Sequence, residues 1–162
     1  MVPRISFENT LKSDSQLPIP PPILALALLV GAGILGIFLP VPAISIPMHL
    51  TMGVLLIALG IGIAGAGFAA FKQAGTPVRP GANPTQFVMS GPYRITRNPM
   101  YLGLLIFTIG WFFVAASPYF LIPPVIFFWI VNFRQIPFEE RLMVDRFGES
   151  YTAYCKRVRR WL

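Results

Sequence analysis

Residues 91–103 read GPYRITRNPMYLG and join a polar loop to an apolar helix. Two turn signals, Gly-Pro and Asn-Pro, fall within this stretch, and Pro99 suits the first turn of a helix because its missing N–H is not needed there. The helix that follows, over about residues 100–116, is uncharged and mostly apolar. The stretch therefore places two arginines and two tyrosines where a membrane span would meet water.

The composition is that of a membrane protein. Of the 162 residues, 55% are hydrophobic and 12% are charged, and the mean hydropathy is +0.67, which is too apolar for an ordinary soluble domain. The many prolines and glycines punctuate the apolar runs or lie within them, as membrane-spanning helices tolerate. With one cysteine and one histidine far apart in the sequence, no disulfide and no Cys/His zinc cluster can be drawn, so we expect no metal site.

Four apolar runs are candidate membrane spans, the first of which has 17 residues and is short for a bilayer core but can extend through its flanking prolines. They cover residues 23–39, 48–71, 100–116 and 119–133. The two short turns that join them in pairs are uncharged, whereas all 13 basic residues lie before the first run, in the loop 72–98, or from Arg134 onward. The positive-inside rule then places both ends and the long loop in the cytoplasm. We predict an all-α, polytopic transmembrane helical bundle of about four spans.

This organisation makes a single membrane domain. Its parts are a cytoplasmic N-terminal segment (1–22), spans one and two (23–71), a cytoplasmic loop (72–98), spans three and four (99–136) and a cytoplasmic tail (137–162). Apolar residues recur near helical spacing in the tail, with Gly148 as a candidate break, which predicts a C-terminal interfacial helix. We expect Tyr151, Tyr154 and Trp161 to face the membrane surface, and the basic run 156–160 to contact anionic lipid rather than nucleic acid.

The opening stretch resembles the cofactor motif of the family that holds isoprenylcysteine carboxyl methyltransferase and the phospholipid N-methyltransferases, integral membrane enzymes that use S-adenosylmethionine. That family's second motif is an acidic pair after the last span, and Glu139 and Glu140 hold this place. Further matches in the tail are Phe147, Gly148, Tyr151 and Tyr154. The resemblance covers roughly residues 75–162. Asn98 stands where the carboxyl methyltransferases carry histidine, so this part of the motif is similar to the phospholipid branch.

The resemblance implies one shared site, because an even number of spans brings the two motifs to the same membrane face. The implied cofactor-binding residues are Tyr93, Arg97, Asn98, Pro99, Tyr101, Gly103, Glu139 and Glu140. We expect Arg97 to bind the carboxylate of the cofactor's methionine part, and the glutamates to bind its ammonium or ribose hydroxyls. Arg134 and Glu139 are the expected catalytic residues, with Glu139 or Glu140 able to orient the acceptor or take its proton. Without the resemblance, the acidic pair would be explained by its place in the first turn of a helix, where acidic side chains interact favourably with the helix dipole.

Several glycines fit helix packing better than cofactor binding. Two Gly-x-Gly-x-x-Gly strings, 31–36 and 60–65, lie in apolar helical runs and lack the strand that a dinucleotide fold needs. Gly53, Gly60, Ala64 and Gly67 share one face of the second span. Small residues let helices approach closely, so we interpret this face as a packing surface. Residues 65–67 also resemble a Gly-x-Gly that the phospholipid branch uses near its cofactor.

We therefore expect an S-adenosylmethionine-dependent methyltransferase at the cytoplasmic face of a bacterial-type inner membrane. Its acceptor would be lipid-like or membrane-soluble, such as a phospholipid amine, an isoprenoid, or a lipophilic thiol or carboxylate, and the sequence leaves the methylated atom open. Two alternatives stay open as well. Membrane sterol and isoprenoid reductases, which bind NADPH, are similar in their C-terminal part, and a non-catalytic membrane protein would bind neither cofactor.

Overall fold

The computed structural model of the protein describes residues 19–45, 47–75 and 87–162. In chain order its elements are α2 (Pro21–Phe38), α3 (His49–Gln73), the 3-10 helix η1 (Gly91–Arg94), α4 (Pro99–Ala115), the 3-10 helix η2 (Pro118–Leu121), α5 (Ile122–Ile130), the π-helical turn η3 (Val131–Gln135), α6 (Ile136–Phe147) and α7 (Glu149–Arg157). Every regular element among the described residues is helical. The predicted N-terminal segment up to residue 18 and the middle of the predicted cytoplasmic loop, 76–86, lie outside them.

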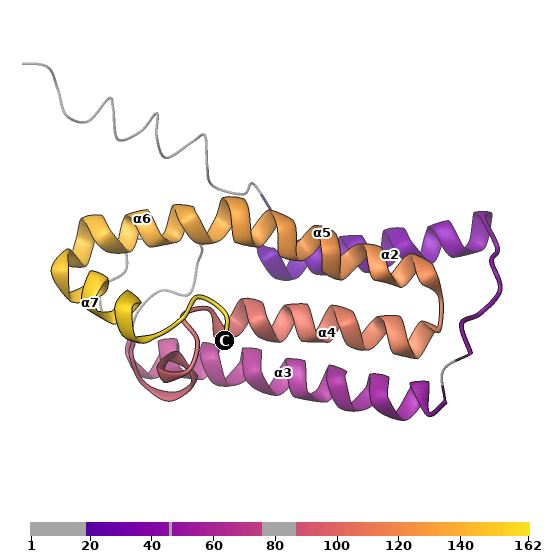
Figure 1. Ribbon diagram of the computed structural model, residues 1–162, viewed down its shortest axis with the longest axis horizontal. Helices are drawn as coiled ribbons and strands as arrows, with labels where there is room; N and C mark the ends of the chain where they lie inside the picture. Colours follow the sequence, from indigo (N-terminus) through magenta and orange to yellow (C-terminus); the bar gives the residue numbers. More distant parts are fainter. Residues whose placement is uncertain (1–18, 46, 76–86) are drawn as a thin grey trace, which may run out of the picture.

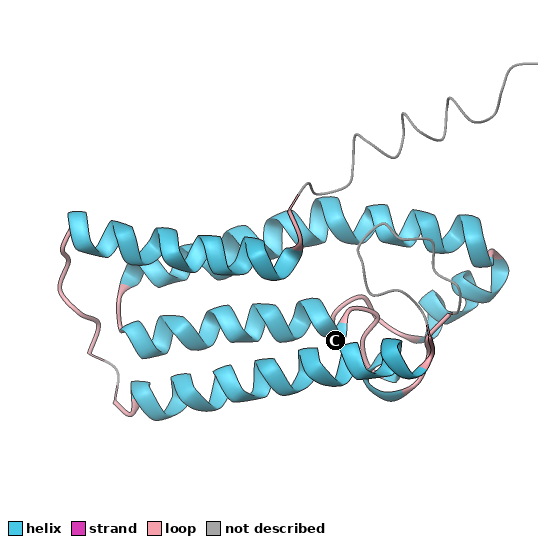
Figure 2. Cartoon of the chain, turned by 180° about the vertical axis from the view of Figure 1, so that it is seen from behind, coloured by secondary structure: helices cyan, strands magenta, loops and turns pink. Residues whose placement is uncertain are grey.

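Helix α4 is the centre of the bundle. It packs along α3 on one side and against α5 and α2 on the other, while α2 also packs against α5. Figure 1 shows these helices running side by side, with α5 and α6 forming one long rod and α7 turning back beneath its end. Figure 2, seen from behind, shows that the loops gather at the two ends of the bundle. The polar loop before α4 and the end of α7 therefore meet at one end.

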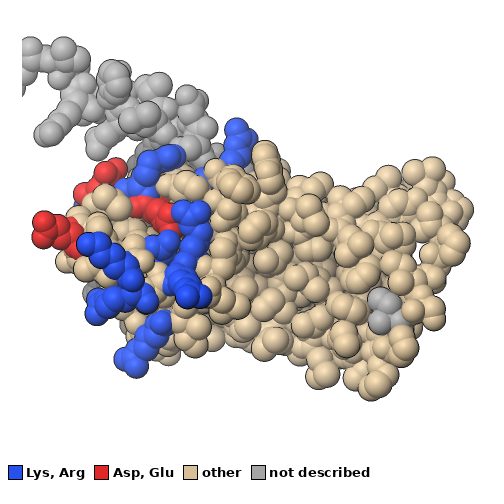
Figure 3. Space-filling view, in the orientation of Figure 1, with Lys and Arg blue, Asp and Glu red and all other residues tan. Residues whose placement is uncertain are grey.

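The helices have the length and composition of membrane spans. Three stretches, α2, α3 and the continuous helix Pro118–Phe147, are long and apolar enough to cross a bilayer, and α4 is apolar and has 17 residues. Many apolar side chains of α2, α3 and the Pro118–Phe147 helix are exposed, which suits a surface that faces lipid and not water. The charged side chains in Figure 3 gather at the end that carries α6 and α7. The predicted all-α membrane bundle is confirmed.

Glycines bring α3 and α4 into backbone contact. A Cβ on Gly60 would lie 2.6 Å from the carbonyl oxygen of Gly103, and a Cβ on Gly103 would lie 2.5 Å from the carbonyl oxygen of Gly60. Gly53 and Gly110 make a second contact of this kind, at 2.9 Å. Neither backbone has room for a side chain at these points, so the predicted packing role of this face is confirmed. Gly65, by contrast, has open space around its Cα.

The fourth span does not end before Pro137, as the sequence suggested, but continues through it as α6 to Phe147. A proline inside a helix removes one hydrogen bond, and its ring collides with the carbonyl group four residues earlier, here that of Phe133. The structure widens the helix into a π turn, η3, directly before Pro137. This turn lets the proline be accommodated without breaking the rod, and π turns of this kind are frequent at functional sites.

The tail reverses direction at Gly148, whose φ of +53° separates α6 from α7. As a result Tyr151 and Tyr154 are buried, at 5% and 4% exposure, and do not face a membrane surface as we had expected. Both rings pack edge-on against Phe87, with centroids 5.5 and 5.0 Å away. The apolar face of α7 is therefore satisfied by the protein itself, because the chain reversal folds it against the segment before η1.

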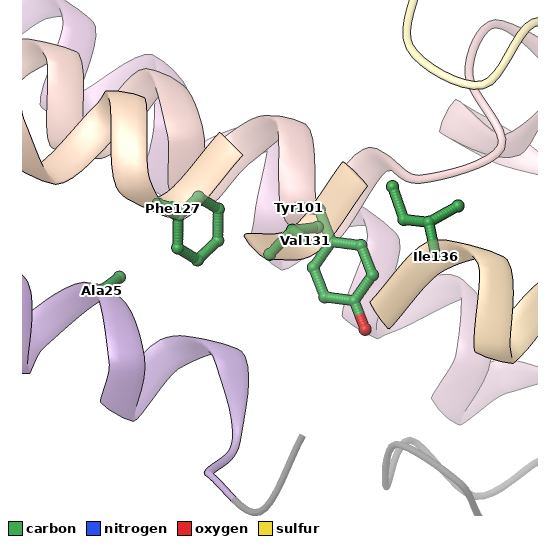
Figure 4. Close-up of a cluster of buried hydrophobic side chains, with 5 residues drawn as sticks. All are labelled: Ala25, Tyr101, Phe127, Val131 and Ile136. Atoms are coloured by element: carbon green, nitrogen blue, oxygen red, sulfur yellow. The ribbon is translucent and has the colours of Figure 1, made fainter. Parts of the chain in front are cut away.

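A cluster of buried side chains joins α2, α4 and the long rod of α5, η3 and α6 near their polar end. Its members are Ala25, Tyr101, Phe127, Val131 and Ile136. Figure 4 shows the Tyr101 ring among these apolar groups, with its hydroxyl at the edge of the cluster. The core thus fixes the ring and leaves one polar atom available for the charged residues beyond it.

Candidate functional site

The loop that leads into α4 is held by the chain that follows α7. The backbone N–H of Arg97 donates to the carbonyl oxygen of Arg159 at 3.0 Å. The carbonyl oxygen of Arg160 accepts two further hydrogen bonds, from Thr96 Oγ1 at 3.1 Å and from Asn98 Nδ2 at 3.0 Å. Asn98 precedes the first residue of α4, yet its side chain does not cap that helix. Its amide instead ties the tail to the loop.

Two arginines share the carboxylate of Glu140. Arg97 Nη2 lies 2.8 Å from Glu140 Oε1, and Arg160 Nη2 lies 2.6 Å from Glu140 Oε2. Arg160 Nε also donates to Oε1, at 3.3 Å. The side chains of Arg97 and Glu140 are mostly buried, with 13% and 19% exposure, so solvent screens their attraction only in part. A hollow of about 340 Å³ lies beside Glu140, and its lining residues are Pro137, Glu140, Arg141, Val144 and Asp145.

Arg97 carries a buried donor with no partner. Its Nε is buried and makes no hydrogen bond to any described residue. A guanidinium presents five N–H donors in a fixed plane, and leaving one buried and unpaired is costly. Such atoms in folded proteins call for an explanation, and an anionic ligand on the guanidinium edge is one that fits this group.

Glu139 has a different environment from its neighbour. Its Oε1 accepts from the Tyr101 hydroxyl at 2.5 Å and from Gln135 Nε2 at 2.7 Å, and both donors are neutral. Gln135 is fully buried and lies one helical turn before Glu139, on the same face. Consecutive residues on a helix point about 100° apart, so Glu139 faces α4 while Glu140 faces the loop and the tail. One helix turn thus presents two carboxylates to two sets of partners.

The structure brings together Arg97, Asn98, Tyr101, Glu139 and Glu140 from the predicted cofactor-binding set, with the Tyr93 phenol near Glu139, and it places Pro99 and Gly103 in packing positions. Tyr93 is buried against Phe71, with ring centroids 5.3 Å apart, and its carbonyl oxygen accepts from the Tyr154 hydroxyl at 2.6 Å. Burial, together with the nearby negative charge of Glu139, raises the pKa of the Tyr93 phenol well above its usual range. Pro99 and Gly103 face α3, against Gly67 and Gly60.

Arg134, which we expected to be catalytic, is exposed in η3 and lies outside the contacts of Arg97 and the glutamates. The residues that our sequence reasoning missed are Thr96, Asn132, Gln135, Arg160 and Trp161. Asn132 Oδ1 accepts from Trp161 Nε1 at 3.0 Å and lies 3.5 Å from Arg160 Nη1. The basic run 156–160 gave no local signal that Arg160 alone turns inward to Glu140, because that depends on where α7 ends.

Several known proteins are similar to part of this chain. The chain is 33% identical over 73 residues to protein-S-isoprenylcysteine O-methyltransferase B of Arabidopsis thaliana, a match that covers 45% of this chain and 37% of that protein. It is 35% identical over 63 residues to an uncharacterized protein of Haemophilus influenzae, covering 39% of this chain and 100% of that protein. It is also 30% identical over 89 residues to a Delta(14)-sterol reductase of Mus musculus, covering 52% and 21% of the two chains. No solved structure matches.

The chain covers little more than a third of the plant methyltransferases that it matches. The family model described as phospholipid methyltransferase matches residues 48–150, well over half of the 162. That range includes α3, α4, α5 and α6, and with them Arg97, Tyr101, Glu139 and Glu140. The chain therefore belongs to the phospholipid methyltransferase family.

Proposed function

We propose that this protein transfers a methyl group from S-adenosylmethionine to a lipid-like or otherwise membrane-soluble acceptor. Family membership supports methyl transfer in a membrane. The observation that carries the proposal is Arg97, whose buried, unpartnered Nε lies beside a paired carboxylate at the polar end of an apolar bundle. A polar cofactor would reach this end from water, and an apolar acceptor would reach it from the bilayer.

The residues present suit this cofactor. The free edge of Arg97 offers charge-assisted hydrogen bonds to a carboxylate, and Glu140 offers acceptors for an ammonium or for hydroxyl groups. When bound, S-adenosylmethionine supplies an electrophilic methyl group on a sulfonium. The protein's own task is then to orient the two reactants and exclude water, which lowers the barrier of a bimolecular step by several kcal/mol.

Glu139 is the residue of this site best suited to accept a proton from the acceptor. In the described part of the chain its hydrogen-bond partners, Tyr101 and Gln135, are neutral, so it is not committed to a guanidinium. Glu140 is held by two guanidiniums, so both of its carboxylate oxygens are already engaged in ion pairs. The two adjacent carboxylates therefore take different roles: Glu140 binds, and Glu139 handles the proton.

The acceptor that we propose is an amine headgroup or a lipophilic thiol. Asn98 stands where carboxyl methyltransferases carry histidine, and an amide has no basic nitrogen that could take a proton. Its NH₂ group is also already used, as the donor to the Arg160 carbonyl oxygen. Methyl transfer in detergent with labelled cofactor would compare phosphatidylethanolamine, a lipophilic thiol and a farnesylcysteine analogue. Turnover of the farnesylcysteine carboxylate alone would contradict this choice of acceptor.

The site is proposed to face the cytoplasm. The basic residues at the polar end support this orientation, since positively charged loops are retained on the cytoplasmic side. In a Cys155→Ser background, single cysteines at Ser150 and Ser45 would report the two ends of the bundle. Labelling of position 150 from outside intact cells, with position 45 protected, would reverse the orientation.

Calorimetric titration of the purified protein with S-adenosylhomocysteine tests the function. The wild type should bind, and Arg97→Ala should weaken binding about a hundredfold or more, because the anionic group of the ligand loses its buried partner. Arg94→Ala is the matched control, since Arg94 lies three residues away in the same segment and is exposed. Equal losses of affinity in both variants would mean that Arg97 contributes only its positive charge and makes no specific contact with the ligand.

A reductase is the second candidate, favoured by the match to the sterol reductase. The same titration with NADPH distinguishes the two functions. Binding of NADPH without S-adenosylhomocysteine would replace our proposal with a reductase. Binding of neither ligand would indicate a membrane protein without this chemistry.

A further inference from the structure

The chain after α7 forms a short extended segment that crosses the polar end of the bundle; we call residues 158–161 the strap. Helix α7 ends at Arg157, and Val158 takes up an extended conformation. From there the strap runs parallel to the loop before α4, with Thr96 and Arg159 as a bridge pair. Its backbone accepts hydrogen bonds from that loop at Arg159 and Arg160, so its path is fixed at these two residues.

The side chains of the strap extend this attachment to the fourth span. Trp161 Nε1 donates to Asn132 Oδ1 at 3.0 Å, and its ring packs on Phe128 with centroids 5.3 Å apart. Trp161 also packs against the buried cluster that contains Tyr101. The strap therefore connects three parts of the site: the loop before α4, the π turn η3 and helix α6.

Arg160 holds Glu140 more completely than Arg97 does. Arg160 contacts both carboxylate oxygens, through Nε at 3.3 Å and Nη2 at 2.6 Å, whereas Arg97 contacts one oxygen through Nη2. A carboxylate and a guanidinium prefer to pair through two parallel hydrogen bonds. Without Arg160, Glu140 would be free to rotate and pair with Arg97 in this way, which would occupy the edge of Arg97 that is now unpartnered.

We propose that Arg160 is a positioning residue, which engages Glu140 so that the guanidinium of Arg97 stays available to an anionic group of the ligand. This inference rests on the proposed function. Arg160 acts through Glu140 and need not touch the ligand. The strap is then part of the binding site, and Asn98 contributes as the residue that anchors the strap, not as a residue that handles protons.

The test is a double-mutant cycle on S-adenosylhomocysteine affinity. Arg160→Ala should weaken binding about tenfold. Arg160→Lys should retain only part of the wild-type affinity, because the lysine ammonium does not make two parallel hydrogen bonds to a carboxylate. Arg159→Ala is the matched control, since Arg159 is the exposed neighbour on the same strap. In a Glu140→Gln background, Arg160→Ala should have no further effect, within about twofold, because a neutral amide no longer captures Arg97. Equal effects of Arg160→Ala with and without Glu140 would overturn the proposal and make Arg160 an independent contact.

Hydrogen exchange of the loop separates this proposal from the proposed function. Asn98→Ala removes one tie to the strap, so the Arg97 amide, which donates to Arg159, should exchange faster with or without ligand. Unchanged exchange in that variant would show that the strap does not depend on Asn98 and would overturn its role as anchor. If the wild type bound no S-adenosylhomocysteine, the proposed function would fail, yet this measurement would still report on the strap.

Discussion

The face of α4 that packs on α3 and the N-terminal end of α4 are held in place by opposite means. Along its length, the contact with α3 is made by the absence of side chains: Gly60 and Gly103 bring the two backbones together. At its N-terminal end, the contacts are made by long charged side chains that converge on Glu140. The first kind of contact depends on shape, and the second on charge and direction.

The difference predicts how each region responds to mutation. A backbone contact has no flexible group that can move aside, so an added methyl group must separate the helices. A network of guanidiniums and carboxylates on a partly exposed surface contributes modestly to stability, because desolvation offsets much of the attraction. The glycine contact should therefore determine whether the bundle folds, and the charged end should determine whether it binds.

The largest effect is expected at the glycine contact. Gly60→Ala would place a Cβ 2.6 Å from a backbone oxygen, so it should lower the free energy of unfolding by about 1–3 kcal/mol or more. Gly62→Ala, two residues away, meets open space and should be neutral or slightly stabilising. Thermal unfolding in detergent measures both. Equal melting temperatures for the two variants would mean that α3 and α4 separate without cost.

The next prediction compares the two adjacent glutamates at the charged end of the bundle. Glu139→Gln keeps a side chain of the same size beside Tyr101 and Gln135 but cannot accept a proton, so turnover should fall about a hundredfold or more. Affinity for S-adenosylhomocysteine should change little. Glu140→Gln should have the opposite effect: it should lower affinity for S-adenosylhomocysteine more than it lowers turnover. The prediction fails if both substitutions alter affinity and turnover in the same proportion.

The smallest effect is a loss of stability in alkali. Burial raises the pKa of Tyr154 to about 12, against the opposing influence of Arg97, compared with 10.0 for a free phenol. Above pH 10 the unfolded chain loses this proton while the folded protein keeps it, so stability should fall as pH rises from 10 toward 12. Tyr154→Phe should reduce the slope of melting temperature against pH in that range. A slope that is the same in both proteins would assign the alkaline loss to other groups.

The bundle and half of the site follow from local properties of the sequence. Apolar runs of sufficient length predict spans, and glycines seven residues apart, such as Gly53 and Gly60, fall on one helix face. Arg97 and the acidic pair could be found because motifs mark them. Their meeting at one face follows from the number of spans between them.

The remaining features depend on contacts between residues distant in the chain. Nothing near Pro137 in the sequence indicates that a π turn would carry the helix through it. Tyr151 and Tyr154 have the spacing of a membrane-surface helix, and only the reversal at Gly148 turns them inward. Arg160 is one of several basic residues in a row, and the end of α7 decides which of them points at Glu140.

The place of the strap in the chain also bears on the order in which the protein folds. Arg160 lies 64 residues after Thr96 and 62 after Asn98, and all four long helices are synthesised before it. The bundle must therefore enter the membrane and pack with the loop before α4 still lacking its partner. Closing so long a loop costs entropy that the strap's few hydrogen bonds recover only once the helices already hold both ends close together. Under the proposed function, ligand binding would therefore require the four long helices to assemble before the strap closes the site.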